Sequence, residues 1–421
     1  MSNEIIQTVI FDYGGVLMRT ADPTPRRELE RRLGLELGGA SEAVFGSPLW
    51  DQAQLGRVSG AEFWADVGRR LELDDGALAE FREVFWSGDR LDEELVAFIR
   101  HLRDEGYRVA LLSNAPVGLH RRLERLGIAD AFDTIVVSGC EGLMKPDPAI
   151  FDLALERMGV RAEEAAFVDD FRENVAAAQQ VGLHAVRFRG LTPLRRQLRE
   201  LGVSVPDPVI EPLPDVRAVI FDWGGVMEGL TDDAHTAAWE RRLALAPGTL
   251  AEALWGETWR ELAVGAISDE EYAQRVADQL GFPSAETMTR FSDEFYSGDR
   301  FRPEVMAAAR ALRGRYQVAL LSNAWPGQAE HVREKFGLDV HAEFDVYVNS
   351  AEVGLSKPDP AIYRLALDRL GVAPEQAIFL DDLLHNVDSA RELGIHAVQF
   401  VDPETSLAEL AALLGHPMAV T

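Results

Sequence analysis

The chain contains very little cysteine and very little lysine. Its 421 residues include one cysteine, Cys140, so no intrachain disulfide can form, and we expect a reducing compartment, the cytoplasm. The three lysines are Lys145, Lys335 and Lys357, and the other basic residues are arginines. Because arginine supplies most of the positive charge, a lysine that recurs at a fixed place indicates a need for a compact ammonium group.

Positive charge and long apolar runs are also scarce. Lys+Arg number 42 against 70 Asp+Glu, a net charge of -28, which would repel a nucleic acid backbone and disfavours anionic membranes. An anionic small substrate would need a metal ion or a locally positive pocket. The sequence has no apolar run of membrane-spanning length. The start, Met1 to Gln7, carries acidic Glu4 and does not resemble a secretory signal.

The remaining composition is that of a globular protein. Hydrophobic residues make up 47% of the chain and charged residues 27%, which favours a soluble folded protein with an ample core. A chain of 421 residues is too long for one ordinary core, so we expect two or more domains.

The chain repeats one plan. Phe11-Asp12-Tyr13-Gly14-Gly15-Val16 returns as Phe221-Asp222-Trp223-Gly224-Gly225-Val226, and further phrases that begin at Val109, Lys145, Phe167 and His184 return at Val318, Lys357, Phe379 and His396. This pattern indicates a tandem duplication. We expect domains at residues 1–205 and 206–421, joined through the proline-rich stretch from Val203 to Asp215.

Each half alternates short apolar runs with segments of helical period, which predicts an α/β fold with a Rossmann-like parallel sheet flanked by helices. In the first half the predicted strands are Thr8–Phe11, Val109–Leu112, Thr134–Val137, Ala166–Val168 and Ala185–Phe188. A long helical stretch interrupts the alternation after the first strand of each half. We expect these stretches, about 18–88 and about 228–298, to form inserted helical caps.

Four polar residues of the first half, Asp12, Ser113, Lys145 and Asp170, each follow a predicted strand or lie in the loop that leads to the next helix. In an open parallel sheet, ligands bind outside the carboxyl ends of the strands, so the fold would gather these side chains. A single aspartate after a strand is usually a turn or helix-cap residue. Four such positions in the same order in both halves outweigh that interpretation.

The set resembles the haloacid dehalogenase superfamily of aspartate-nucleophile hydrolases, over nearly all of both halves and including a helical cap of the C1 type. The resemblance implies catalysis by Asp12 and Asp222, as nucleophiles that form an aspartyl-phosphate, and by Lys145 and Lys357, which neutralise it and the phosphoryl oxygens. It also implies phosphate binding by Ser113, Asn114, Ser322 and Asn323.

The same resemblance implies a magnesium site in each half. The ligands would be Asp12, Asp170 and the backbone carbonyl of Gly14 in the first half, and Asp222, Asp382 and the carbonyl of Gly224 in the second. Asp169, Asn174, Asp381 and Asn386 would support them. Magnesium prefers such oxygen ligands and, with lysine, stands between a carboxylate nucleophile and a negatively charged phosphoryl group.

Gly14 and Gly224 depart from the usual pattern, since most phosphatases of this superfamily have an aspartate there. That aspartate protonates the leaving oxygen, a kind of help that typically contributes on the order of 10²- to 10⁴-fold. Some branches resemble this chain in having the glycine and a double aspartate, and they are sugar-phosphate phosphatases. The missing aspartate leaves three possibilities open. Another group replaces the acid, the substrate has a leaving group that needs no acid, or hydrolysis is not the function.

We therefore expect a magnesium-dependent hydrolase of small phosphorylated metabolites, with an anomeric phosphate, an acyl phosphate or a diphosphate as a suitable substrate. Three alternatives stay open: a lyase that ionises a prenyl diphosphate, a 2-haloacid dehalogenase, and a chain in which one half is a non-catalytic structural partner. We expect neither a nucleic acid nor a membrane as partner, and self-association is left open.

Overall fold

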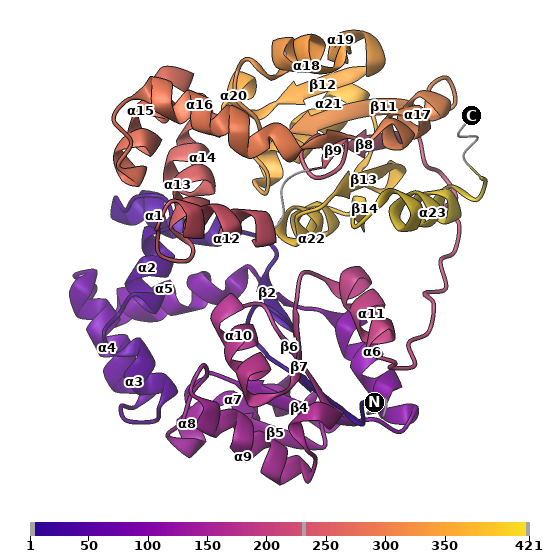
Figure 1. Ribbon diagram of the computed structural model, residues 1–421. Helices are drawn as coiled ribbons and strands as arrows, with labels where there is room; N and C mark the ends of the chain where they lie inside the picture. The colour runs from indigo at the N-terminus through magenta and orange to yellow at the C-terminus, as the bar shows by residue number, and fades with distance from the viewer. Residues whose placement is uncertain (1–4, 230–232, 418–421) are drawn as a thin grey trace. The chain divides into compact units, whose positions relative to one another are not determined.

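The computed structural model describes residues 5–229 and 233–417 and divides the chain into two compact units, Met1–Pro208 (unit 1) and Val209–Thr421 (unit 2). The division lies within the proline-rich stretch. In Figure 1, unit 1 runs from indigo to magenta and unit 2 from pink to yellow.

Unit 1 is built on five parallel strands in the order β5-β4-β1-β6-β7. The central strand β1 has no charged residue and is completely buried, as expected for a strand covered on both faces. Its last residue, Phe11, lies beside Leu111 of β4 and Val168 of β6. The strands are β1 (Thr8–Phe11), β4 (Arg108–Ser113), β5 (Thr134–Val137), β6 (Ala165–Asp169) and β7 (His184–Arg187).

Helices cover both faces of this sheet (Figure 1). Alternate strand residues pack on opposite faces; Ile10 and Leu112, for example, pack with Phe151 of one covering helix. The helices outside the cap are α6 (Glu93–Asp104), α7 (Leu119–Arg125), α8 (Ser138–Glu141), α9 (Pro148–Met158), α10 (Arg172–Val181) and α11 (Leu191–Glu200), with short 3₁₀ turns at Ala129–Ala131 and Ala162–Glu164.

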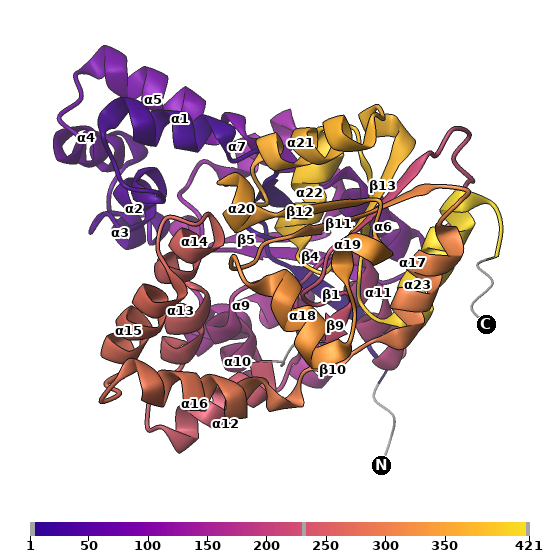
Figure 2. The same ribbon diagram turned by 90° about the horizontal axis from the view of Figure 1, so that it is seen from above.

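A small antiparallel hairpin encloses the helical insertion of unit 1: β2 (Met18–Thr20) precedes the insertion and pairs with β3 (Asp89–Leu91), which follows it. Between these strands lie α1 (Thr24–Leu33), α2 (Gly39–Phe45), α3 (Trp50–Gln54), α4 (Gly60–Arg70) and α5 (Asp75–Ser87), gathered into one group in Figure 2. Phe63, Phe81 and Phe85 form the centre of their own hydrophobic core. Most aromatic residues of the insertion therefore serve its packing.

Unit 2 repeats the plan with a sheet in the order β12-β11-β8-β13-β14. Its strands are β8 (Ala218–Phe221), β11 (Gln317–Ser322), β12 (Val346–Asn349), β13 (Ala377–Asp381) and β14 (His396–Gln399), and its hairpin joins β9 (Glu228–Gly229) to β10 (Arg300–Phe301). Between the hairpin strands lie α12 (Asp233–Arg242), α13 (Thr249–Trp255), α14 (Glu257–Ala263), α15 (Asp269–Leu280) and α16 (Ala285–Phe295), followed by a 3₁₀ turn at Tyr296–Gly298.

The remaining helices of unit 2 cover its sheet. They are α17 (Pro303–Leu312), α18 (Gln328–Phe336), α19 (Val340–Glu343), α20 (Ser350–Val353), α21 (Pro360–Leu370), α22 (Leu384–Glu392) and α23 (Pro403–Leu414), with a 3₁₀ turn at Pro374–Gln376. Within residues 5–229 and 233–417, no helix has both the length and the apolar character that crossing a membrane requires.

The predicted α/β fold in two repeated halves is confirmed. All five strands predicted for the first half are present, and each end lies within one residue of its predicted place.

Candidate functional site

The carboxyl ends of three neighbouring strands bring the predicted site of unit 1 together. Asp12 follows β1, Ser113 is the last residue of β4, and Asp169 and Asp170 stand at the end of β6. The carboxylates of Asp12, Asp169 and Asp170 each offer an oxygen, and these oxygens lie within 4.8 Å of one another. The sheet therefore concentrates three negative groups at one point, as its topology predicts.

Lys145 provides the positive charge of this cluster. Its Nζ lies 2.9 Å from Oδ1 of Asp12 and 2.5 Å from Oδ2 of Asp169, and it donates to the carbonyl of Leu112 at 3.0 Å. The side chain is 1% exposed. Burial alone lowers the pKa of Lys145, but the charges of Asp12 and Asp169 raise it by more, so the ammonium stays charged.

The two aspartates after β6 have different partners. Asp169 accepts hydrogen bonds from Lys145, from the amide of Asn174 at 3.0 and 3.1 Å, and from the Phe171 N–H at 2.8 Å. Oδ1 of Asp170 is buried and has no hydrogen-bond partner among the described residues. Asp169 is thus held by the protein, whereas Asp170 has an oxygen free for a ligand.

Burial raises the pKa of Asp170 to about 7, and the nearby charges of Asp12 and Asp169 add to this increase. Burial also raises the pKa of Asp12 to about 6, against the opposing effect of Lys145. Three crowded carboxylates with one lysine leave negative charge uncompensated, and an all-oxygen donor set suits magnesium. The residues of the cluster therefore fit a divalent cation.

The two glycines after Asp12 differ in what their surroundings require. Gly15 has φ +76°, and a Cβ there would lie 2.1 Å from Oδ2 of Asp170, so only glycine fits. A Cβ on Gly14 would meet nothing within 4 Å. Packing therefore does not exclude a side chain at Gly14, and the absence of an acid there is a property of the sequence.

The Asn114 side chain links the serine loop to the lysine loop. Its Nδ2 donates to the backbone carbonyl of Lys145 at 2.8 Å, and its Oδ1 accepts from the Lys145 N–H at 2.8 Å. Both polar atoms of the Asn114 side chain are therefore occupied by the backbone of Lys145. Gln54, in α3 of the insertion, donates to the Asn114 carbonyl at 2.9 Å, a contact that the sequence analysis missed.

Unit 2 reproduces the cluster closely. Nζ of Lys357 lies 2.8 Å from Oδ1 of Asp222 and 2.6 Å from Oδ2 of Asp381. Asp222, Asp381 and Asp382 form the second group of three carboxylates. Burial raises the pKa of Asp382 to about 7 and raises that of Asp222 well above its usual range.

The supporting contacts of unit 2 also match. Asn386 donates to both oxygens of Asp381, at 2.9 and 3.1 Å. The Asn323 side chain exchanges two 2.8 Å hydrogen bonds with the backbone of Lys357. Gly225 has φ +76°, and a Cβ there would lie 2.2 Å from Cγ of Asp382. Both units therefore bring the proposed aspartates, lysine and supporting asparagine together, with the serine at the end of the neighbouring strand.

An arginine beside each site was not identified from the sequence. In unit 1, Arg19 of β2 donates to the Val16 carbonyl at 2.7 Å, pairs with Asp92 at 2.8 Å and lies over the Phe188 ring. In unit 2, Arg302, just after β10, donates to the corresponding Val226 carbonyl at 3.0 Å and lies over the corresponding ring, that of Phe400.

The two arginines come from opposite sides of the hairpin. Arg302 stands where unit 1 has Asp92, since both directly follow the second strand and donate their backbone N–H to the residue just before the first strand, Met227 and Leu17 respectively. The position of Arg19 is occupied in unit 2 by Gly229, where a Cβ would lie 3.2 Å from Nη2 of Arg302. Repetition could not reveal this pair, because neither arginine recurs in the other half.

The residue that follows Asp12 differs from the residue that follows Asp222. Trp223 donates its indole N–H to Glu228 at 2.9 Å, and Glu228 pairs with Lys335 at 2.8 Å. Tyr13, the corresponding residue of unit 1, is buried. The third lysine of the chain thus belongs to the surroundings of the second site.

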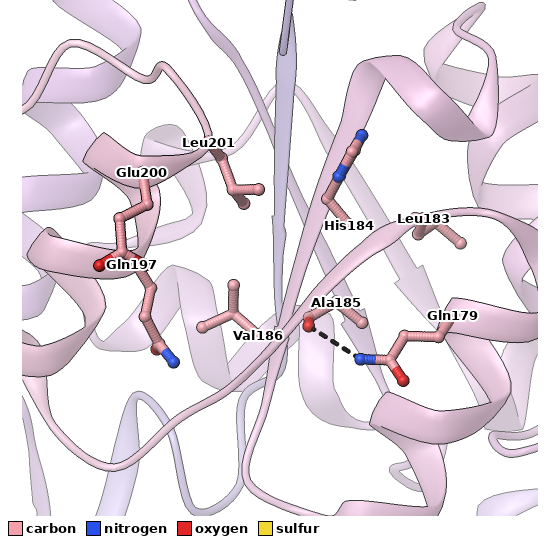
Figure 3. Close-up of a pocket in the computed structure, with 8 residues that line it drawn as sticks. All are labelled: Gln179, Leu183, His184, Ala185, Val186, Gln197, Glu200 and Leu201. Carbon is pink, nitrogen blue, oxygen red and sulfur yellow. Dashed lines mark hydrogen bonds between the residues drawn. The ribbon is translucent and has the colours of Figure 1, made fainter.

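An open hollow of about 370 Å³ lies at the β7 edge of the unit 1 sheet (Figure 3). Within it, Gln179 donates to the Ala185 carbonyl at 3.4 Å. The eight residues drawn in Figure 3 include none of the aspartate, serine or lysine residues of the site. This hollow therefore does not mark the candidate site.

Comparison with known proteins gives a family match for both units. The model described as "Hydrolase: haloacid dehalogenase-like hydrolase" matches residues 6–182 and 216–394. "Acyl-CoA dehydrogenase family member 10" of Mus musculus is 34% identical over 215 residues, which are 48% of this chain and 19% of that protein. The chain thus spans only a small part of that relative.

Two further relatives are matched over nearly their whole length by about half of this chain. The "Sesquiterpene phosphatase astK" of Aspergillus oryzae is 28% identical over 196 residues, 46% of this chain and 96% of that protein. A "Phosphoglycolate phosphatase" of Yersinia pseudotuberculosis is 29% identical over 225 residues, 51% of this chain and 93% of that protein.

Proposed function

The chain belongs to the haloacid dehalogenase-like hydrolase family, and from that premise we propose that it is a magnesium-dependent phosphatase of small metabolites. The observation that carries the proposal is the contact of Nζ of Lys145 with Oδ1 of Asp12 at 2.9 Å, beside the free oxygen of Asp170. A buried carboxylate held by an ammonium next to a cation site is suited to attack phosphorus. The sesquiterpene phosphatase and the phosphoglycolate phosphatase described above support this choice.

In this mechanism, a carboxylate oxygen of Asp12 attacks the phosphorus atom and the ester oxygen leaves, which gives an aspartyl-phosphate that water then hydrolyses. Lys145 and the Ser113 hydroxyl bind phosphoryl oxygens and stabilise the charge on them. Bound magnesium, held by Asp12, Asp170 and the Gly14 carbonyl, would supply further positive charge. Asn174 and Lys145 keep Asp169 in place. Asp222, Ser322, Lys357, Asp382 and the Gly224 carbonyl have the same roles in unit 2.

The leaving group decides which substrates this site hydrolyses well. Gly14 and Gly224 carry no acid, so the departing oxygen leaves without a proton from that position. Groups that are stable as anions, such as those of an anomeric phosphate, an acyl phosphate or a diphosphate, depart readily without it. Simple alkyl phosphates would lose the contribution of about 10²- to 10⁴-fold that general acid catalysis provides.

A substrate screen tests the proposal. The protein is assayed with magnesium against phenyl phosphates, sugar phosphates, acyl phosphates, prenyl diphosphates and alkyl phosphates, beside the double variant Asp12→Asn/Asp222→Asn. We expect phosphate release that favours good leaving groups and that is lost in the double variant and after chelation of the metal. Equal turnover of alkyl phosphates would overturn the leaving-group argument, and release of pyrophosphate with a hydrocarbon would replace the phosphatase by a lyase.

A further inference from the structure

Unit 2 contains a buried chain of polar side chains that ends on the hydroxyl of Ser322. Nε2 of Gln328, at the start of α18, donates to Oγ of Ser322 at 2.9 Å. The Tyr347 hydroxyl donates to Oε1 of Gln328 at 3.0 Å, and Nδ2 of Asn349 donates to the Tyr347 oxygen at 3.0 Å. Gln328 and Asn349 are buried, so these bonds form largely away from water.

The backbone fixes the direction of every bond in this chain. Nδ2 of Asn349 lies 2.9 Å from the Trp325 carbonyl, which can only accept, and Oδ1 of Asn349 accepts from the Ala351 N–H at 2.9 Å, which can only donate. The Asn349 amide therefore has one orientation. The second amide hydrogen of Asn349 is donated to the Tyr347 hydroxyl oxygen. The Tyr347 hydroxyl must therefore direct its own proton at Oε1 of Gln328.

Gln328 in turn presents its NH₂ group to Ser322. Burial raises the pKa of Tyr347 to about 12, so its hydroxyl keeps the proton that it donates to Gln328. A serine hydroxyl has one donor and two acceptor sites, and the bond from Gln328 uses an acceptor site. The Ser322 proton is thus directed away from Gln328 and remains available to an acceptor in the site.

At the corresponding positions, all within the described part of unit 1, this hydrogen-bonded chain has no counterpart. Ser113 is followed six residues later by Leu119, where Ser322 is followed by Gln328. In the strand pairing, Ser113 lies opposite Val137 and Ser322 opposite Asn349, and Ile135 takes the place of Tyr347. Three apolar side chains therefore replace three polar ones behind the serine, and nothing from these positions can orient the Ser113 hydroxyl.

We propose that Gln328, aligned by Tyr347 and Asn349, is a positioning residue that holds the Ser322 hydroxyl as a hydrogen-bond donor to phosphate, so that unit 2 binds phosphate more tightly than unit 1. The inference rests on the proposed function in taking Ser322 as a phosphate ligand. A hydroxyl that is already oriented loses less conformational freedom when phosphate binds, and a single hydrogen bond to a charged group of this kind is worth about tenfold in affinity.

The test is calorimetric titration of the full chain with inorganic phosphate in the presence of magnesium. We expect two classes of site that differ by about tenfold in affinity. Gln328→Met keeps the length of the side chain and removes the donor, and it should weaken the tighter site by about tenfold. Gln328→Glu keeps the shape but accepts the serine proton, so it should weaken that site further.

Two more variants separate orientation from packing. Leu119→Met in unit 1 is the matched control and should leave both phosphate affinities unchanged. Tyr347→Phe removes one oxygen from the chain, keeps the ring packed against His341, and should weaken only the tighter site. Thermal unfolding of each variant shows whether it is folded, and Tyr347→Phe serves as the test if a Gln328 variant is not.

The outcomes for the inference and for the proposed function are distinct. Unchanged phosphate affinities in Gln328→Met and Tyr347→Phe overturn the proposed role of the hydrogen-bonded side chains, whatever the enzyme hydrolyses. Weakened phosphate binding in these variants, without turnover of any phosphate ester by the parent protein, supports the positioning role of Gln328 and overturns the proposed phosphatase activity. Absence of phosphate binding to the parent protein overturns both.

Discussion

Gly14 shows how little separates this site from one with a general acid. The space around a Cβ at Gly14 is open, whereas Gly15 lies against Asp170. Substitution of Gly14 therefore tests the effect of adding an acid to the site, and substitution of Gly15 tests the effect of displacing Asp170.

We expect Gly14→Asp, in an Asp222→Asn background that leaves only unit 1 active, to raise the turnover of alkyl phosphates by about 10²-fold or more, because the new carboxyl can protonate the leaving oxygen. Turnover of p-nitrophenyl phosphate, whose leaving group needs no proton, should change much less. Steady-state kinetics with both substrates measure this. The matched variant Gly15→Ala displaces Asp170 and should lose activity with both, and an equal gain on both substrates for Gly14→Asp would contradict the assignment.

The raised pKa values of Asp12 and Asp170 predict a link between pH and magnesium. Both groups bind protons more readily in the folded, metal-free protein than in the unfolded chain, so their contribution to stability is present at lower pH and is lost as pH rises toward about 7. Magnesium needs both carboxylates without protons. We therefore expect magnesium to raise the melting temperature more at pH 8 than at pH 6.

Thermal unfolding with and without magnesium at the two pH values measures this difference. The double variant Asp170→Asn/Asp382→Asn, which removes one carboxylate from each cluster, should show a smaller effect of magnesium at both. A larger stabilisation by magnesium at pH 6 than at pH 8 in the parent protein would contradict the prediction.

Residues that recur in both halves could be predicted from the sequence, and residues that do not recur could not. Asp12, Ser113, Lys145 and Asp170 stand after strands and reappear at matching places. Gln328 belongs to one half only, and a glutamine at the start of a helix has no distinctive pattern. The only indication of its role is that Leu119 holds the corresponding position in unit 1. That difference can be interpreted only when the strand pairing places Tyr347 and Asn349 near Ser322.

At the scale of elements, the central strands were predictable and the hairpins were not. Buried parallel strands are continuous apolar runs, as in Thr8–Phe11. The hairpin strands are two or three residues long and carry charged or polar residues, for example Arg19 and Asp89, so no periodicity reveals them. They form because they close the insertion, a long-range contact that the local sequence does not encode.

The contribution of the hairpin arginine to stability can be tested by moving it from position 19 to position 92 of unit 1. Arg19→Gly alone leaves Asp92 without its guanidinium partner, and we expect it to destabilise the protein by about 2 kcal/mol, since the pair is largely shielded from water. The double variant Arg19→Gly/Asp92→Arg copies the arrangement of unit 2 and should recover part of this loss, because Asp92→Arg also removes the hydrogen bond with which Asp92 caps α6 at the Leu95 N–H. Chemical denaturation of the parent, both single variants and the double variant gives the coupling energy between positions 19 and 92. Additive changes in the free energy of unfolding would show that an arginine at position 92 does not replace Arg19.

At the scale of the whole molecule, each unit carries its own cluster of three aspartates and a lysine, which includes the proposed nucleophile and the proposed metal ligands. Complete clusters in both units favour two working sites over one active half with a structural partner. The surroundings of the two clusters differ, at Tyr13 and Trp223 and at Leu119 and Gln328. We therefore expect two active sites with different kinetic constants.

Single variants test whether both units work. Asp12→Asn and Asp222→Asn should each retain part of the activity of the parent, and the two residual rates should add up to the parental rate if the sites act independently. Inorganic phosphate should inhibit Asp12→Asn, in which unit 2 is active, at lower concentration than Asp222→Asn. One single variant that abolishes all turnover would identify the other unit as silent.

The position of the hairpin arginine also limits how the two copies of the repeat can exchange segments. A recombination event between the hairpin strands would combine Arg19 with Arg302, two guanidinium groups for one place, or Gly229 with Asp92, which leaves that place empty. The first hybrid would place two like charges side by side, and the second would lose the arginine contact to the loop after Asp12 or Asp222. The two halves are therefore expected to diverge as separate sequences, each conserving its own solution to the same packing problem.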